Sequence, residues 1–172
     1  NCKVVYAGSS SHHNGIYENP YTFSKDIGEQ LCEMYYRVYG VETRICRFYN
    51  VYGDSQLTEG EYAAVVGIFL EQYKHNKPLT ITGDGEQRRD FTHVDDIVDG
   101  MFLSMSKEFG TYELGSGVNY SINELANMFG EDYPKEYIEE RVGEARETLC
   151  KKPDLLLVKN NLEDYIKGEI SE

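Results

Sequence analysis

The sequence predicts an α/β protein with a parallel sheet, because strand-like and helix-like segments alternate along the chain. Residues 3–7 are short, apolar and β-branched, as in a buried strand of a parallel sheet. Residues 62–74 carry an apolar stripe at i, i+3, i+4 spacing, which is typical of an amphipathic helix and consists of Val65, Val66, Phe69, Leu70 and Tyr73.

The first strand is followed by a loop and a long helix. The polar residues 8–15 predict the loop. Asn19 can cap a helix and Pro20 suits its first position, so we expect a helix to begin there. Gly40 is a common C-terminal stop and ends it.

Two further strands are expected on either side of the helix 62–74. Residues 43–48 form the first, and the chain leaves it through a loop at 50–54. Residues 79–82 alternate like a strand and end in the turn 83–85.

The next part of the chain predicts a short extended segment, a helix and a strand. Residues 90–94 are the extended segment, and Asp95 or Asp96 then caps a helix that continues to Met105. Residues 111–114 are the strand.

The last part of the chain gives one strong helix signal and one weak one. Ser121 and Glu124 form a capping box that opens a helix to Phe129. Residues 155–158 fit a strand or a helix, and residues 162–166 predict a helix.

Composition excludes several classes of protein. The 172 residues hold 17 Lys+Arg and 30 Asp+Glu, a net charge of −13, so the surface repels nucleic acid. No run approaches the ~18 apolar residues of a membrane span, and no signal peptide is recognisable, so we expect a cytoplasmic protein. We therefore expect the cysteines to be buried, reduced thiols; they are Cys2, Cys32, Cys46 and Cys150.

Tyr21 and Lys25 are candidates for proton transfer. They stand four residues apart on one predicted helix and therefore share a face. A neighbouring ammonium favours the phenolate form of a tyrosine, which suits a general acid/base acting on a sugar or alcohol oxygen. Ser9, Ser10 and Ser11 follow a strand, where ligands bind in open α/β sheets, and could hydrogen-bond the same oxygen.

Several segments together resemble the NAD-dependent epimerase/dehydratase family, the extended short-chain dehydrogenases that act on nucleotide sugars. The motifs occur in the family's order and run from residue 3 to about residue 150: they are residues 4–11, 19–25, 46–53, 83–96 and 141–146. The resemblance implies a partial Rossmann-like parallel sheet with a small α/β substrate-binding subdomain. Residues 1–58 would belong to the dinucleotide-binding domain and 59–172 mainly to the subdomain, with 90–107 returning to the Rossmann part.

The resemblance also implies catalytic and cofactor-binding roles. Tyr21 would be the acid/base, and Lys25 would favour its phenolate and bind the nicotinamide ribose. Ser9, with Ser10 as the alternative, would hold the reacting sugar hydroxyl. Tyr49 would lie near the nicotinamide.

The family's substrate-binding roles fall on a second group of residues. Arg89 and Arg141 would clamp the substrate's pyrophosphate, because a guanidinium is permanently charged and forks onto two oxygens. Asn50 would bind on the same side, and Glu144 would accept a hydrogen bond from the nucleotide ribose. Two residues of the strand that borders the base would also contact substrate: Thr80 and Thr82.

The implied reaction is epimerisation at C4 of a UDP-linked or related hexose, by hydride transfer to and from NAD. Family members that are 4,6-dehydratases carry Thr-Asp-Glu where this chain has Ser9-Ser10-Ser11, which favours the epimerase. The family's Gly-x-x-Gly-x-x-Gly phosphate loop does not occur in this sequence. We therefore expect that the N-terminal half of the dinucleotide-binding domain is missing, and that this chain alone has an exposed sheet edge and binds NAD weakly. The sequence leaves open whether the cofactor is NAD or NADP. The alternatives are a non-catalytic nucleotide-sugar-binding remnant and a nucleotide-sugar 4,6-dehydratase.

No metal site is expected, because no carboxylate or cysteine lies at ligand spacing from His12 or His13. Family resemblance permits a homodimer through the helices in residues 18–40 and 60–76, or association with the missing half.

Overall fold

A three-stranded parallel sheet forms one part of the computed structural model, which describes residues 2–60, 63–140 and 143–171. Its strands are β1 (Lys3–Ser9), β2 (Glu42–Phe48) and β7 (Thr111–Leu114), in the order β1-β2-β7. Both pairs are parallel, which confirms the predicted sheet. Within the described chain β1 is an edge strand, as expected.

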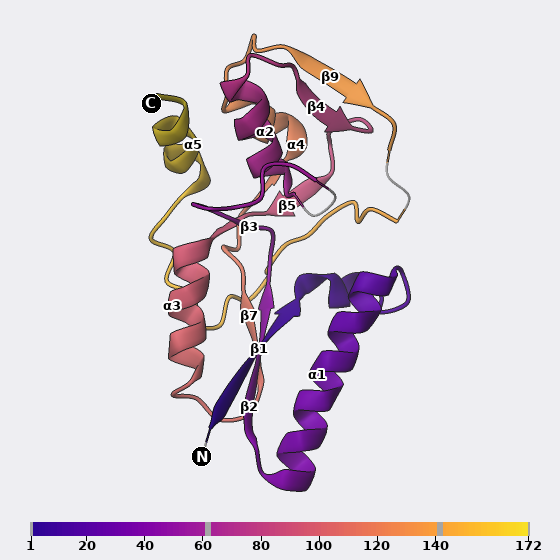
Figure 1. Ribbon diagram of the computed structural model, residues 1–172, viewed down its shortest axis with the longest axis vertical. Coiled ribbons are helices and arrows are strands. Elements are labelled where there is room, and N and C mark those ends of the chain that lie inside the picture. Colours follow the sequence, from indigo (N-terminus) through magenta and orange to yellow (C-terminus); the bar gives the residue numbers. More distant parts are fainter. Residues whose placement is uncertain (1, 61–62, 141–142, 172) are drawn as a thin grey trace.

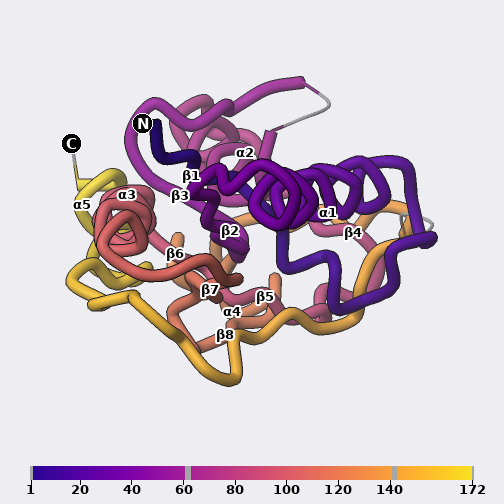
Figure 2. The backbone as a smooth tube through the Cα atoms, turned by 90° about the horizontal axis from the view of Figure 1, so that it is seen from below, coloured from indigo at the N-terminus to yellow at the C-terminus, as the bar shows by residue number. Residues whose placement is uncertain are grey.

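Two helices cover opposite faces of this sheet, α1 (Pro20–Tyr39) and α3 (Val94–Ser104) (Figures 1 and 2). Neighbouring residues of β2 point to opposite faces. Cys46 packs with Ile97 of α3, and Arg47 bonds Glu29 of α1.

The signals that predicted α1 are confirmed. The Asn19 side chain accepts a hydrogen bond from the Thr22 N–H, and Gly40 ends the helix in the left-handed conformation at φ 64°. Gly28 lets α1 approach β1 closely, because a Cβ there would overlap the Tyr6 hydroxyl. This close approach positions the N-terminal turn of α1 beside the end of β1.

The predicted cap of α3 is wrong. The cap is His93, whose Nδ1 lies 3.2 Å from the Asp95 backbone N–H that donates to it. Asp96 is buried instead, and its carboxylate accepts hydrogen bonds from the backbone N–H groups of Lys159 and Asn160. Asp96 therefore ties the C-terminal segment to α3.

The remaining elements form the upper part of Figure 1. Strand pairs β3–β6 and β4–β9 are parallel, whereas β5–β8 is antiparallel. The bounds are β3 (Val51–Tyr52), α2 (Val65–Lys74), β4 (Leu79–Thr82), β5 (Arg88–Asp90), β6 (Thr92–His93), β8 (Asn119–Ser121), α4 (Ile122–Asn127), β9 (Lys135–Ile138) and α5 (Leu162–Ser171). Their core includes Phe69, Leu79, Ile81, Leu125 and Ile166.

Some of these bounds differ from the sequence prediction. The capping box at Ser121 is confirmed, but α2 begins at Val65, and residues 61–62 lie outside the described residues. Residues 155–158 form neither strand nor helix. The loop predicted at 8–15 contains the end of β1 and a 3₁₀ turn, η1 (Ser10–Asn14).

The apolar stripes of α1 and α2 have different environments. Val66 and Phe69 of α2 are buried in the core, so this stripe is already covered. On α1, Phe23, Ile27 and Leu31 are exposed. Of these two helices, α1 therefore retains an apolar face of the kind expected for a homodimer.

Cys32, Cys46 and Cys150 are buried and free, as expected, whereas Cys2 is exposed. No helix in the described ranges combines the length and apolar character needed to cross a membrane.

Candidate functional site

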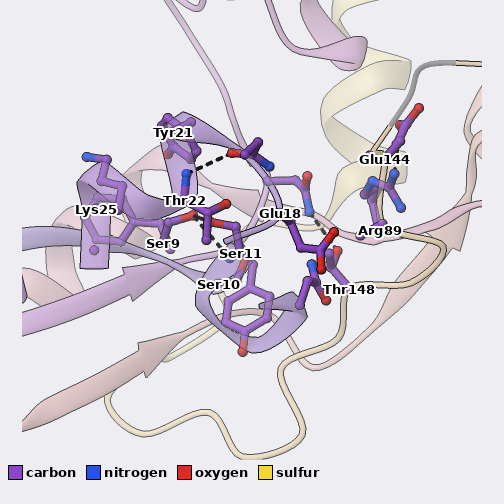
Figure 3. A pocket seen from close by; sticks show the side chains of 18 of the residues that line it. Ser9, Ser10, Ser11, Glu18, Tyr21, Thr22, Lys25, Arg89, Glu144 and Thr148 are labelled. Atoms are coloured by element: carbon purple, nitrogen blue, oxygen red, sulfur yellow. Dashed lines mark hydrogen bonds and ion pairs between the residues drawn. The ribbon is translucent and has the colours of Figure 1, made fainter. Parts of the chain in front are cut away.

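A cavity of about 570 Å³ opens at the carboxyl ends of β1 and β2, where ligands bind in open α/β sheets. Figure 3 shows Ser9, Tyr21 and Lys25 on one side and Arg89 and Glu144 on the other. The structure thus brings together in one cavity the described residues predicted for catalysis, for the cofactor and for the pyrophosphate: Ser9, Ser10, Tyr21, Lys25, Tyr49, Asn50, Arg89 and Glu144.

Tyr21 and Lys25 lie one helical turn apart near the start of α1. The Lys25 Nζ donates to the Ala7 carbonyl oxygen at 3.0 Å and lies 5.9 Å from the centre of the Tyr21 ring. The bond to Ala7 fixes the ammonium at the end of β1. Tyr21 is 57% exposed, so its hydroxyl is accessible to a substrate in the cavity.

The serines form the turn that follows β1. Ser9 caps η1, and its Oγ accepts from the Ser11 backbone N–H at 3.2 Å and lies 2.9 Å from the Ser11 Oγ. Ser9 and Ser10 are both largely buried. The turn therefore holds two hydroxyl-bearing residues at the wall that also carries Tyr21.

Tyr49 is the second phenol of the cavity and is only 3% exposed. Its hydroxyl donates to the Glu113 Oε2 at 2.9 Å. Burial and the neighbouring Glu113 carboxylate raise the pKa of Tyr49 well above its ordinary value. Tyr49 therefore stays a neutral phenol, and of the two phenols that line the cavity Tyr21 is the one beside an ammonium.

At the opposite end of the cavity, Arg89 forms an ion pair with Glu144 at 2.8 Å. Asn50 donates to the Thr148 Oγ1 at 3.0 Å and to the Asp90 carbonyl at 3.1 Å, which fixes its amide. Arg141, predicted to share the pyrophosphate with Arg89, lies outside the described residues.

Thr80 and Thr82 lie in an adjoining cavity of about 200 Å³. Asn50, Arg89 and Glu144 line both cavities, so the two are continuous. The walls of the smaller cavity are mostly apolar, with Val65, Val66, Ile68, Phe91 and Ile138 among them. A ligand in which a flat apolar group is attached to a charged group could occupy both cavities.

Carboxylates lie beside both histidines, although the sequence spacing gave no sign of them. The His12 Nδ1 lies 3.0 Å from the Asp26 carboxylate and 4.0 Å from that of Glu29, and His13 lies 3.0 Å from Glu113. Folding brings these groups together from distant segments. The Glu29 carboxylate already pairs with Arg47 at 2.7 Å, so it is engaged by a guanidinium.

Three residues of the cavity lie outside the family motifs and were missed by the sequence analysis: Asn14, Glu18 and Thr148. Glu18 directly precedes the Asn19-Pro20-Tyr21 motif, and Thr148 comes two residues after the motif 141–146. The adjacency of Glu18 and Thr148 to these motifs could have identified them as candidate site residues.

A family model for the NAD dependent epimerase/dehydratase family matches residues 5–115 of this chain. A putative UDP-glucose 4-epimerase of Methanocaldococcus jannaschii is 37% identical over 110 residues, covering 64% of this chain and 36% of the relative. UDP-glucuronic acid decarboxylase 1 of Arabidopsis thaliana is 34% identical over 145 residues, covering 83% of this chain and 33% of the relative.

The fold is also similar to a solved UDP-glucose 4-epimerase from Thermotoga maritima with UDP-glucose. The TM-score is 0.86 at 26% identity, and the match covers 98% of this chain and 62% of that one. The chain spans about a third of the length of the curated relatives that it matches.

Proposed function

The chain belongs to the NAD-dependent epimerase/dehydratase family, and from this premise we propose that it forms the catalytic and substrate-binding part of a nucleotide-sugar 4-epimerase. The observation that carries the proposal is the single cavity that holds Ser9, Tyr21 and Lys25 at one end and Arg89 at the other. A phenol beside an ammonium suits proton transfer, and a guanidinium suits a pyrophosphate.

Proton transfer is the task of the first group. Tyr21 takes the proton of the sugar 4-hydroxyl and later returns it, while the Lys25 ammonium favours the phenolate form that accepts it. Lys25 is held by the Ala7 carbonyl, so its charge stays beside the phenol. The hydroxyl of Ser9, with Ser10 as the alternative, orients the same sugar oxygen.

Nucleotide binding is the task of the second group. A pyrophosphate would bind Arg89, whose guanidinium is now paired with Glu144. Glu144 would then be released to accept from the nucleotide ribose. The base would enter the adjoining cavity, between its apolar walls and Thr80 and Thr82.

The residues fit one end of NAD. The Lys25 ammonium and the Tyr21 hydroxyl would bind the nicotinamide ribose, and Tyr49 would offer a neutral ring nearby. NAD held there would supply the hydride acceptor and donor that epimerisation at the sugar carbon requires. The glycine-rich turn that lets backbone amides reach a dinucleotide pyrophosphate is absent from this sequence.

Calorimetry with UDP-glucose and with NAD tests the proposal against the non-catalytic remnant. Our proposal expects UDP-glucose to bind this chain, and NAD to bind once a glycine-rich dinucleotide-binding half is supplied. Sugar-nucleotide binding with no NAD binding in that combined protein would favour the remnant. A chain that binds neither UDP nor UDP-glucose contradicts the proposal.

We also propose that residues 1–58 and 90–107 form the dinucleotide-binding part, and that most of 59–172 binds the substrate. The exposed apolar side chains of α1, among them Phe23, Ile27 and Leu31, favour a homodimer that covers this face. Sedimentation of the Leu31→Lys variant tests this, because a charge on the face should leave a monomer.

A further inference from the structure

A second cavity, of about 430 Å³, lies directly beside the catalytic one. The two share four residues at their boundary: Ser10, Asn14, Tyr49 and Thr148. A substituent on a sugar held at Tyr21 can therefore extend past this boundary. Apart from Ser10, the alternative to Ser9, no residue of the second cavity takes part in the proposed proton transfer.

Polar groups at the boundary are free to bind a ligand. Within residues 2–60, 63–140 and 143–171, the Ser10 hydroxyl and the Asn14 amide have no side-chain hydrogen-bond partner. Tyr49, by contrast, donates its hydroxyl to Glu113. The boundary thus offers a hydroxyl and an amide donor to any acceptor that reaches it.

Two ammonium groups of the second cavity have no ion-pair partner among the described residues. Lys151 and Lys152 lie on its wall and are exposed, and neither forms an ion pair with another described residue. Two adjacent unpaired ammonium groups are notable in a chain with a net charge of −13.

The acidic residues of the same cavity are already engaged. Glu113 accepts from Tyr49, pairs with Arg47 at 3.2 Å and lies 3.0 Å from the His13 Nε2. Glu147 accepts from the neutral Asn119 amide at 2.8 Å and keeps its charge, so one carboxylate without a described ion-pair partner stands against the two ammonium groups. An anion entering this cavity would therefore meet more uncompensated positive charge than negative charge.

We propose that the second cavity binds a carboxylate carried by the sugar of the substrate. This inference rests on the proposed function and narrows its substrate class to nucleotide-linked sugar acids, such as a uronic acid. A carboxylate accepts hydrogen bonds only, and the cavity supplies donors from Ser10, Asn14 and the two lysines.

The catalytic cavity itself is a poorer place for that carboxylate. Its acidic residues are Glu18 and Glu144, and its described cations have other tasks: Lys25 beside Tyr21, and Arg89 at the pyrophosphate. A carboxylate kept there would face Glu18 with no free cation among the described lining residues. Like-charge repulsion thus favours the second cavity.

Calorimetry at low ionic strength with UDP, UDP-glucose and UDP-glucuronic acid tests this inference. We expect UDP-glucuronic acid to bind about tenfold more tightly than UDP-glucose, the sum of two solvent-exposed ion pairs. Lys151→Gln combined with Lys152→Gln should remove this preference and leave UDP-glucose binding unchanged. The preference should also shrink as salt is added.

The matched control is Lys77→Gln combined with Lys167→Gln, which removes the same charge at exposed positions outside both cavities. It should keep the tenfold preference. Equal binding of the two sugars, or a preference that survives in the Lys151/Lys152 variant, overturns the inference while leaving the proposed function standing. Loss of binding to UDP and UDP-glucose in the unaltered chain overturns the proposed function as well.

Discussion

The buried carboxylate of Asp90 gives the sharpest prediction about what holds the site together. Asp90 is fully buried, at 0% exposure, at the end of β5. Its Oδ1 accepts from the Ser116 backbone N–H at 2.9 Å and the Ser116 Oγ at 2.7 Å. Its Oδ2 accepts from the backbone N–H groups of Gly117 at 3.0 Å and Cys150 at 2.9 Å.

Asp90→Asn preserves the shape of this side chain but replaces one acceptor oxygen with an NH₂ donor. If the NH₂ replaces Oδ2, it faces the N–H groups of Gly117 and Cys150, and if it replaces Oδ1, it faces that of Ser116. Either orientation removes the carboxylate acceptor of at least one backbone N–H, at about 1–3 kcal/mol for each group left unpaired, and the charge-assisted bonds are lost. The Ser116 N–H keeps only its bond to the Thr92 Oγ1 at 3.2 Å. We expect the free energy of unfolding to fall by about 2–4 kcal/mol.

Urea denaturation followed by circular dichroism measures this loss as a lower midpoint with an unchanged slope. Asp99→Asn is the control, because Asp99 is half exposed and pairs only with Lys159 at the surface. The free energy of unfolding of this control variant should fall by at most about 1 kcal/mol. A loss below about 1 kcal/mol for Asp90→Asn would refute the reasoning, because it would mean that the orphaned N–H groups find other partners.

Three further predictions concern single groups. The Arg146 guanidinium lowers the pKa of Asp84 to about 2, so carbon-detected NMR titration should show that this carboxyl is still mostly ionised when the pH has fallen well below the ordinary pKa, and is half protonated only near the lowered one. Arg146→Gln should return the pKa of Asp84 to the ordinary range. The stabilising contribution of the pair is present above the ordinary pKa and is lost as the pH falls through the lowered pKa. Because burial and Glu113 raise the pKa of Tyr49, Tyr49→Phe should leave the ultraviolet titration below pH 11 unchanged, and a missing ionisation step in that range would contradict it. Arg89→Gln should weaken UDP-glucose binding by about tenfold or more in calorimetry, as loss of a charge-assisted contact implies, whereas Arg37→Gln on the exposed surface of α1 should leave it unchanged.

Local signals predicted the elements whose ends are decided by their own residues. Asn19, Pro20 and Gly40 bound α1 because a cap, a fixed φ and a left-handed stop act within one turn. The capping box at Ser121 worked for the same reason.

The cap of α3 is an error of local reasoning. Sequence analysis offered Asp95 or Asp96, but the structure uses His93, and Asp96 instead accepts hydrogen bonds from the backbone N–H groups of residues 159–160. That contact joins residues more than sixty positions apart, so no local pattern encodes it.

The family motifs predicted which residues line the cavity, but not the hydrogen bonds and ion pairs that these residues form. The contact between Tyr49 and Glu113 requires β2 and β7 to be neighbours, and the contact between His12 and Asp26 requires η1 to fold back on α1. The second cavity, with Lys151 and Lys152 on its wall, is likewise a product of tertiary structure.

The central claim is that Tyr21 is the acid/base of this site, and turnover of the Tyr21→Phe variant tests it most directly. The assay needs NAD, a nucleotide sugar and a protein that carries both this chain and a glycine-rich dinucleotide-binding half. We expect Tyr21→Phe to lower kcat by about a hundredfold or more with the fold intact, because general acid–base catalysis contributes about 10²–10⁴-fold. Tyr17→Phe, at an exposed position outside the cavity, should keep full activity. Turnover of Tyr21→Phe at the rate of the unaltered protein would contradict the role given to this phenol.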